Sequence, residues 1–69
     1  MPRWLKREAA AYHCGMAPSY FDQLVRDGVL PEPHIIGRLT LYDRHEVDEA
    51  MSRLPRRGEI DEELPEPEV

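Results

Sequence analysis

Polar side chains that suit nucleic-acid recognition are concentrated between residues 19 and 26. Glutamine pairs with adenine through two hydrogen bonds and arginine pairs with guanine or phosphate, so Gln23 and Arg26 suit a DNA groove. Ser19 and Tyr20 carry hydroxyls that donate to phosphate oxygens. Asp22 lies among them, where it either accepts from a cytosine amino group or caps a helix. This segment is a candidate DNA-contact surface if one helix presents these side chains together.

A metal or catalytic site is the competing chemistry, because the chain contains His13, Cys14, His34 and His45. Zinc sites use recurrent spacings such as C-x-x-C or H-x-x-x-H, and the sequence has neither. It also has no glycine-rich phosphate loop and no nucleophile motif, and the chain is too short to enclose a reaction pocket. We therefore predict no metal, no cofactor and no enzymatic activity. Cys14 is expected to be a small buried residue at a turn.

A first helix is predicted from about Leu5 to His13, after a ragged end formed by Met1–Arg3. Leu5, Ala9 and Tyr12 follow one another at i, i+4 and i+7, which is one face of a helix. We expect Trp4 to cover one end of the core.

A second helix is predicted from Pro18 to about Asp27, and it carries the polar segment. Pro18 suits the first helical position, where a missing N–H costs nothing and the free N–H groups that follow suit a phosphate. Ser19 and Asp22 read as a capping box one register later. Gly28 ends the helix as a left-handed residue. The apolar stripe expected to face the core is Phe21, Leu24 and Val25.

A tight hairpin is predicted over residues 34–42, because two β-rich runs are separated by Gly37 and Arg38, as in a type II′ turn. Both faces of this hairpin carry an isoleucine, so the pattern leaves open which face is buried. The predicted cross-strand pairs are Ile36 with Leu39 and Ile35 with Thr40.

The tip of that hairpin adds a second candidate contact to DNA. Arg38 stands on the projecting turn, where it suits a phosphate or the minor groove, and Thr40 lies beside it. The predicted DNA-contact set is therefore Pro18, Ser19, Tyr20, Asp22, Gln23, Arg26, Arg38 and Thr40.

A third helix is predicted from Arg44 to Leu54 and is stopped by Pro55. Asp43 suits the N-cap, and Glu46 stands where a capping box needs it. The residues at core spacing are Val47, Ala50, Met51 and Leu54.

Charge divides the 69 residues into two parts. Residues 1–57 hold nine Lys and Arg against eight Asp and Glu, whereas residues 58–69 hold six acids and no base. We therefore predict a folded domain over residues 1–54 and a disordered acidic tail over residues 55–69. The sequence has neither a membrane-length apolar run nor an N-terminal signal pattern, so a cytoplasmic protein without membrane contact is expected.

The order of these segments resembles the AlpA and excisionase branch of the MerR-like winged helix-turn-helix proteins. The similarity covers about residues 4–54 and rests on Arg7–Tyr12, Gly15–Gly28, Leu30-Pro31, Ile36–Arg38 and Asp43–Met51. It implies a mainly α fold with a small β-hairpin wing, a recognition helix in the major groove and a wing on the backbone or minor groove. Ala17 departs from the pattern, since the family usually has a Ser or Thr cap there.

The resemblance implies sequence-specific binding of double-stranded DNA. The protein would act as a small transcriptional regulator, beside RNA polymerase, or as an excisionase-like factor that directs a recombinase on a prophage or other mobile element. A module of this size is expected to self-associate on DNA, as a dimer or a head-to-tail array. The protein would be bacterial or phage-derived and associated with the nucleoid. The alternative is a protein-interaction module, or an acidic mimic of DNA that binds a basic partner.

Overall fold

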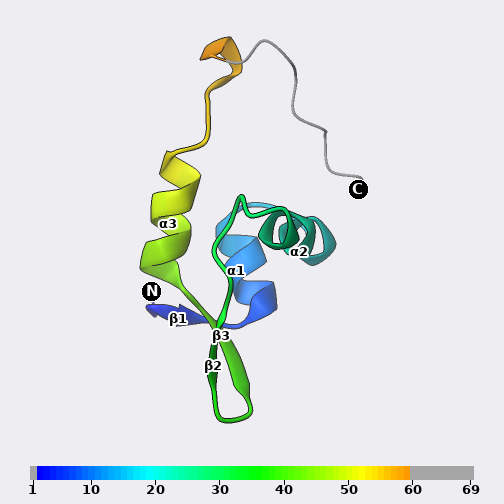
Figure 1. Cartoon of the computed structure of the whole chain (residues 1–69), viewed down its shortest axis with the longest axis vertical. Coiled ribbons are helices and arrows are strands. Elements are labelled where there is room, and N and C mark those ends of the chain that lie inside the picture. The colour runs from blue at the N-terminus through cyan, green and yellow to red at the C-terminus, as the bar shows by residue number, and fades with distance from the viewer. Residues whose placement is uncertain (1, 60–69) are drawn as a thin grey trace.

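Helices and a small sheet make up the part of the chain that the computed structural model describes, which is residues 2–59 (Figure 1). Its elements are β1 (Trp4–Leu5), α1 (Arg7–His13), α2 (Pro18–Arg26), β2 (His34–Ile36), β3 (Leu39–Asp43), α3 (Arg44–Ser52) and a 3-10 turn, η1 (Arg57–Glu59). The strands form one antiparallel sheet in the order β1-β3-β2. The described residues thus combine helices with a sheet, as predicted, and the sheet has one strand more than predicted.

The bounds of α2 follow from local signals, as expected. Pro18 is its first residue, and the chain leaves it through Gly28, whose φ of 80° is in the left-handed region that favours glycine. The predicted Ser19–Asp22 capping box is wrong. Ala17 occupies the N-cap without a side-chain hydrogen bond, because helix formation begins one residue earlier at the proline.

The hairpin also has the predicted register. Ile36 pairs with Leu39 and Ile35 with Thr40. Gly37 has a φ of 59°, which suits the first central position of a type II′ turn. Between positions 2 and 59 only glycines have a positive φ, so Arg38 has the negative φ that the second central position requires.

The N-terminal end is not ragged at Arg3, in contrast to the prediction. Trp4 and Leu5 pair with Asp43 and Tyr42 as β1, and the backbone N–H of Arg44 donates to the carbonyl of Arg3. Because side chains alternate along a strand, Leu5 enters the core while Trp4 lies on the opposite face of the sheet. Trp4 therefore does not cover the core. Its ring meets His34 edge-on at 5.1 Å.

The buried face of α1 differs from the predicted one. Ala10 and Ala11 are fully buried, whereas Ala9 is exposed and Tyr12 is 86% exposed. With Leu5 taken into β1, the predicted stripe loses its first member and the helix turns its small side chains inward. Alanine lets α1 approach the rest of the core closely, and the spacing of large apolar residues gave no sign of this.

The core lies between the helices and the inner end of the sheet, which is the end where β1 pairs with β3. Phe21 of α2 meets Tyr42 of β3 edge-to-face at 4.9 Å, and Val47 of α3 is fully buried beside them. The predicted stripe of α2 is confirmed, since Leu24 and Val25 pack against this cluster. The buried apolar residues are Leu5, Ala10, Ala11, Phe21, Leu30, Tyr42, Val47 and Ala50.

Of the predicted capping box at the start of α3, the N-cap at Asp43 is confirmed and the contribution of Glu46 is not. The Asp43 carboxylate accepts a hydrogen bond from the backbone N–H of His45, which makes Asp43 the N-cap. The predicted partner role of Glu46 is wrong, because its carboxylate contacts His34 on β2. α3 ends at Ser52, so Leu54 follows the helix and is only partly buried.

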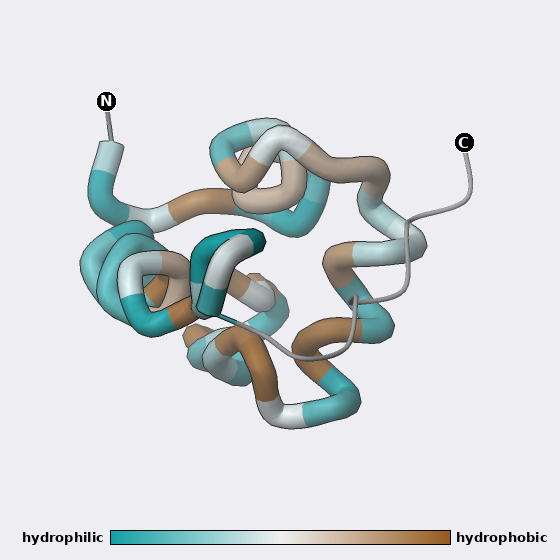
Figure 2. Tube along the Cα trace, turned by 90° about the horizontal axis from the view of Figure 1, so that it is seen from above, coloured by the Kyte–Doolittle hydropathy of each residue, from teal (hydrophilic) through white to brown (hydrophobic). Residues whose placement is uncertain are grey.

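Hydrophobic residues occur in short stretches separated by hydrophilic ones (Figure 2). Among the described residues, no helix has the length and apolarity to cross a membrane. The segment predicted to be a disordered tail, residues 55–69, contains η1, and its residues 60–69 lie outside the described part of the chain.

Candidate nucleic-acid interface

The exposed face of α2 holds three of the predicted contact residues together. Ser19, Gln23 and Arg26 are spaced i, i+4 and i+7, and all three are exposed. Pro18 stands at the start of the same helix and is half-buried. α2 therefore presents an amide, a hydroxyl and a guanidinium along one side, which is the chemistry that a base edge and a phosphate need.

Asp22 is held by an ion pair that the sequence did not reveal. Nε of Arg7, on α1, donates to Oδ2 of Asp22 at 2.8 Å, and its Nη2 lies 2.8 Å from the same oxygen. The hydrogen bond from Arg7 holds the pKa of Asp22 below its ordinary value. The carboxylate thus neither caps α2 nor stands free for a cytosine. The ion pair joins α2 to α1, and the positive charge of Arg7 neutralises the negative charge of Asp22 beside the contact face.

Tyr20 lies beside the exposed face of α2 rather than at its centre. It is half-buried and lines a groove together with Gln23 and Leu24. Tyr20 also has an interaction with another part of the protein. Tyr20 is therefore placed to shape the edge of the interface.

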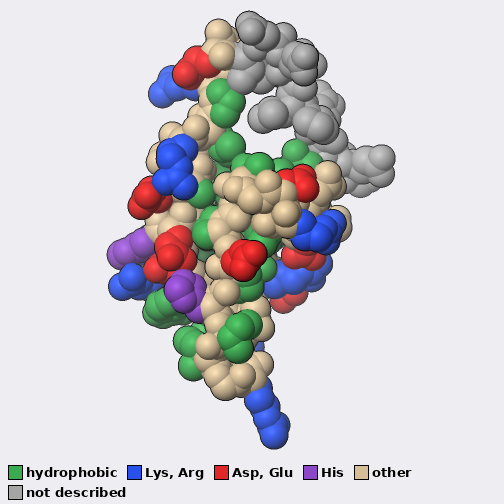
Figure 3. All heavy atoms as spheres, in the orientation of Figure 1, with side chains coloured by type: hydrophobic (Ala, Val, Ile, Leu, Met, Phe, Trp, Pro, Cys, Tyr) green, Lys and Arg blue, Asp and Glu red, His purple; other side chains and the backbone are tan. Residues whose placement is uncertain are grey.

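The hairpin carries the second group of predicted contacts, apart from α2. It projects beyond the helices (Figure 1), and a basic side chain extends from its tip (Figure 3). Arg38 and Thr40 are both exposed there. The predicted residues thus form two groups on separate elements, with the helical group on α2 and the wing group on the β2–β3 hairpin.

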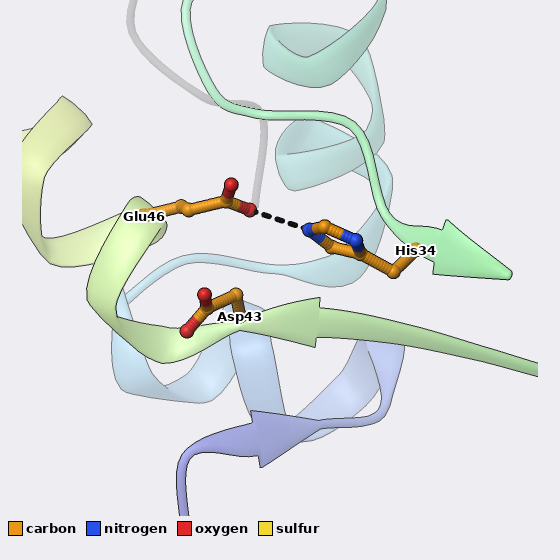
Figure 4. A group of neighbouring side chains, drawn as sticks. All are labelled: His34, Asp43 and Glu46. Atoms are coloured by element: carbon orange, nitrogen blue, oxygen red, sulfur yellow. Dashed lines mark hydrogen bonds and ion pairs between the residues drawn. The ribbon is translucent and has the colours of Figure 1, made fainter. Parts of the chain in front are cut away.

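A polar corner at the base of the hairpin, where β2 begins, β3 ends and α3 starts, was not predicted (Figure 4). His34 Nε2 lies 2.9 Å from Glu46 Oε1, and one ligand atom of each of His34, Glu46 and Asp43 lies within 4.8 Å of the others. Such a set has the chemistry of a metal site. However, Nε and Nη2 of Arg3 donate to the two Asp43 oxygens, each at 3.1 Å. The Arg3 guanidinium thus already neutralises the Asp43 carboxylate that a cation would need. We therefore interpret the corner as an ion-pair cluster that joins the residue before β1 to the end of β3, and β2 to α3.

Among the described residues, no three of the histidines and the cysteine considered for zinc lie close enough together to hold one ion. His13 Nε2 contacts Asp48 Oδ1 at 2.6 Å, which joins the end of α1 to α3, and His34 contacts Glu46. Burial raises the pKa of the Cys14 thiol, which favours the protonated form over the thiolate that binds metals. Cys14 is half-buried and packs against the core.

Comparison of the chain with protein-family models, with curated proteins and with solved structures found no match.

Proposed function

We propose that this chain binds double-stranded DNA as a small winged helix-turn-helix protein, with α2 in the major groove and the β2–β3 hairpin as the wing. The observation that carries the proposal is the pair of exposed groups described above. α2 presents Ser19, Gln23 and Arg26 on one side, and the hairpin extends Arg38 away from the body. Two short helices joined by a four-residue turn, followed by a projecting hairpin, are the elements that such proteins use to read DNA.

The charge distribution is compatible with this role. The net charge of −5 comes from residues 58–69, and residues 1–57 are close to neutral. The ion pair between Arg7 and Asp22 further reduces the negative charge next to Gln23 and Arg26. Affinity is therefore expected to be moderate, and specificity to depend on several copies bound at repeated sites, either at a promoter or beside a recombinase.

The test is selection from a pool of random duplexes across a salt series. We expect a recovered sequence motif and an affinity that falls as salt rises, because lysine and arginine contacts to phosphate release counterions. Inverted repeats in the motif would favour a regulator, and direct repeats an excisionase-like array. Folded protein that binds no duplex even at low salt would refute the proposal.

A second candidate function is a protein-interaction module, and the exposed apolar side chains of the hairpin favour it. Ile35 is 69% exposed, Ile36 51% and Leu39 49%. Apolar residues gathered on a projecting element are typical of protein contacts. This function predicts a partner that protects the hairpin and no salt-dependent affinity for DNA.

A further inference from the structure

An apolar groove of about 340 Å³ lies between α2 and the segment that follows α3. Its walls include Met16, Tyr20, Leu24, Val29, Leu54 and Pro55. Asp27 is the single charged residue among the described residues that line it. An occupant must therefore be held by apolar contacts rather than by ion pairs.

The groove opens where the chain leaves the folded body. Pro55 forms part of its wall, and the acidic segment 60–69 begins five residues later. Five extended residues span at most about 18 Å. This segment offers Ile60 and Leu64, whose i, i+4 spacing is the one that apolar anchors use in groove-binding segments.

A neighbouring hollow of about 310 Å³ provides a contrast. It lies between residues 28–31 and α3, and its walls include Glu46, Glu49 and Arg53. Arg53 already pairs with Glu49 at 2.8 Å, so the wall offers no free positive charge to an acidic segment. The apolar groove is the better match to Ile60 and Leu64.

We propose that residues 60–64 of the same chain occupy the apolar groove and hold the acidic segment beside α2. Gln23 both lines this groove and belongs to the exposed face of α2. A segment seated there carries Asp61, Glu62 and Glu63 to the edge of that face, where they repel phosphate and compete for Arg26. The docking is independent of the proposed function, whereas its inhibitory effect on DNA binding rests on it.

Docking is tested in the full chain, without DNA, by methyl NMR spectra of an Ile60→Ser/Leu64→Ser variant. This variant keeps every charge. We expect the methyl signals of Met16, Leu24, Val29 and Leu54 to shift, while those of Leu39 on the hairpin stay unchanged. Val69→Ser is the matched control, and it should leave the groove signals in place. Unchanged groove signals in the double variant would overturn the proposal, as would signals that shift on dilution of the wild type, because they would assign the groove to a second copy.

Inhibition is tested with the same variants and random duplex DNA at low salt. If the docked form makes up about nine-tenths of the free protein, its release raises the apparent affinity about tenfold. We expect this gain in Ile60→Ser/Leu64→Ser and not in Val69→Ser. Shifted groove signals with unchanged affinity would overturn the inhibitory role and leave docking in place. An absence of DNA binding by every variant would refute the proposed function, and the NMR result would still decide docking.

Discussion

Strand β3 passes through two environments within five residues. At its inner end, Tyr42 and Asp43 are buried, with β1 alongside and the helices over one face. At its outer end, Leu39 and Thr40 pair only with β2 and are exposed. The same strand is therefore part of the core at one end and a projecting arm at the other.

The difference shows that residue type alone does not decide burial here. Leu39 and Ile35 are as apolar as Leu5, yet only Leu5 lies under the helices. The cross-strand hydrogen bonds and the turn at Gly37 shape the arm, whereas packing against Phe21 and Val47 holds the inner end. Apolar residues on the arm thus contribute little to folding and are available for contact with a partner or with DNA.

The largest effect is expected at the inner end, from Phe21→Ala. Phe21 is fully buried against Tyr42, and removal of a buried phenyl ring costs about 3–5 kcal/mol. A single core of this size supplies rarely more than that, so the variant should be largely unfolded. Circular dichroism and urea unfolding measure this outcome. A cooperative transition with an unchanged midpoint would show that the inner end is not the source of stability.

An intermediate loss of stability is expected for Asp43→Asn. Asparagine preserves the helix cap but removes the charge that Arg3 binds with two hydrogen bonds. The Tm of Asp43→Asn should fall by less than the Tm of Phe21→Ala. The Tm of Asp43→Ala, which also loses the helix cap, should be lower than the Tm of Asp43→Asn.

The same pair predicts a dependence on pH. The hydrogen bond from Arg3 holds the pKa of Asp43 below its ordinary value, so the folded state binds this proton more weakly than the unfolded state. The contribution of Asp43 is therefore present above the ordinary pKa of about 4 and is lost as the pH falls through the lower folded value. The Tm difference between wild type and Asp43→Asn should shrink over that range. A difference that is constant with pH would contradict the role of the ion pair.

At the outer end, Arg38→Ala should change binding but not folding. Arg38 is exposed at the turn, so the Tm should stay constant. If it contacts phosphate, affinity for DNA should fall by about tenfold, with the salt slope smaller by about 1. Arg53→Ala removes the same charge from the residue that follows α3 and is the control, with little expected loss. Equal losses in both variants would indicate a general effect of charge instead of a contact by the wing.

The smallest effect on stability is expected for Ile35→Ser. Ile35 is 69% exposed, and surface substitutions are usually within about 0.5 kcal/mol of neutral. Denaturant unfolding should give a midpoint close to that of the wild type. A loss approaching that of Phe21→Ala would show that the arm is packed in solution, against a second copy or another part of the chain.

The sequence by itself determined the features that depend on the local backbone. Pro18 and Gly28 set the bounds of α2, and Gly37 set the turn and with it the register of the hairpin, because each of these residues restricts or permits particular backbone angles within its own segment. The stripe of α2 followed from spacing for the same reason. These features were predicted with the correct partners.

The tertiary structure decided the features that join distant segments. Strand β1 pairs with β3 from a distant part of the described chain, the hydrogen bonds between Arg3 and Asp43 join residues 40 positions apart, and Arg7 meets Asp22 across a separation of 15. No local preference encodes such contacts, since each forms only when the whole core has brought its two segments together. The burial of Ala10 and Ala11 in place of Tyr12, and the exposure of the hairpin isoleucines, were settled in the same way, by where the helices came to lie over the sheet.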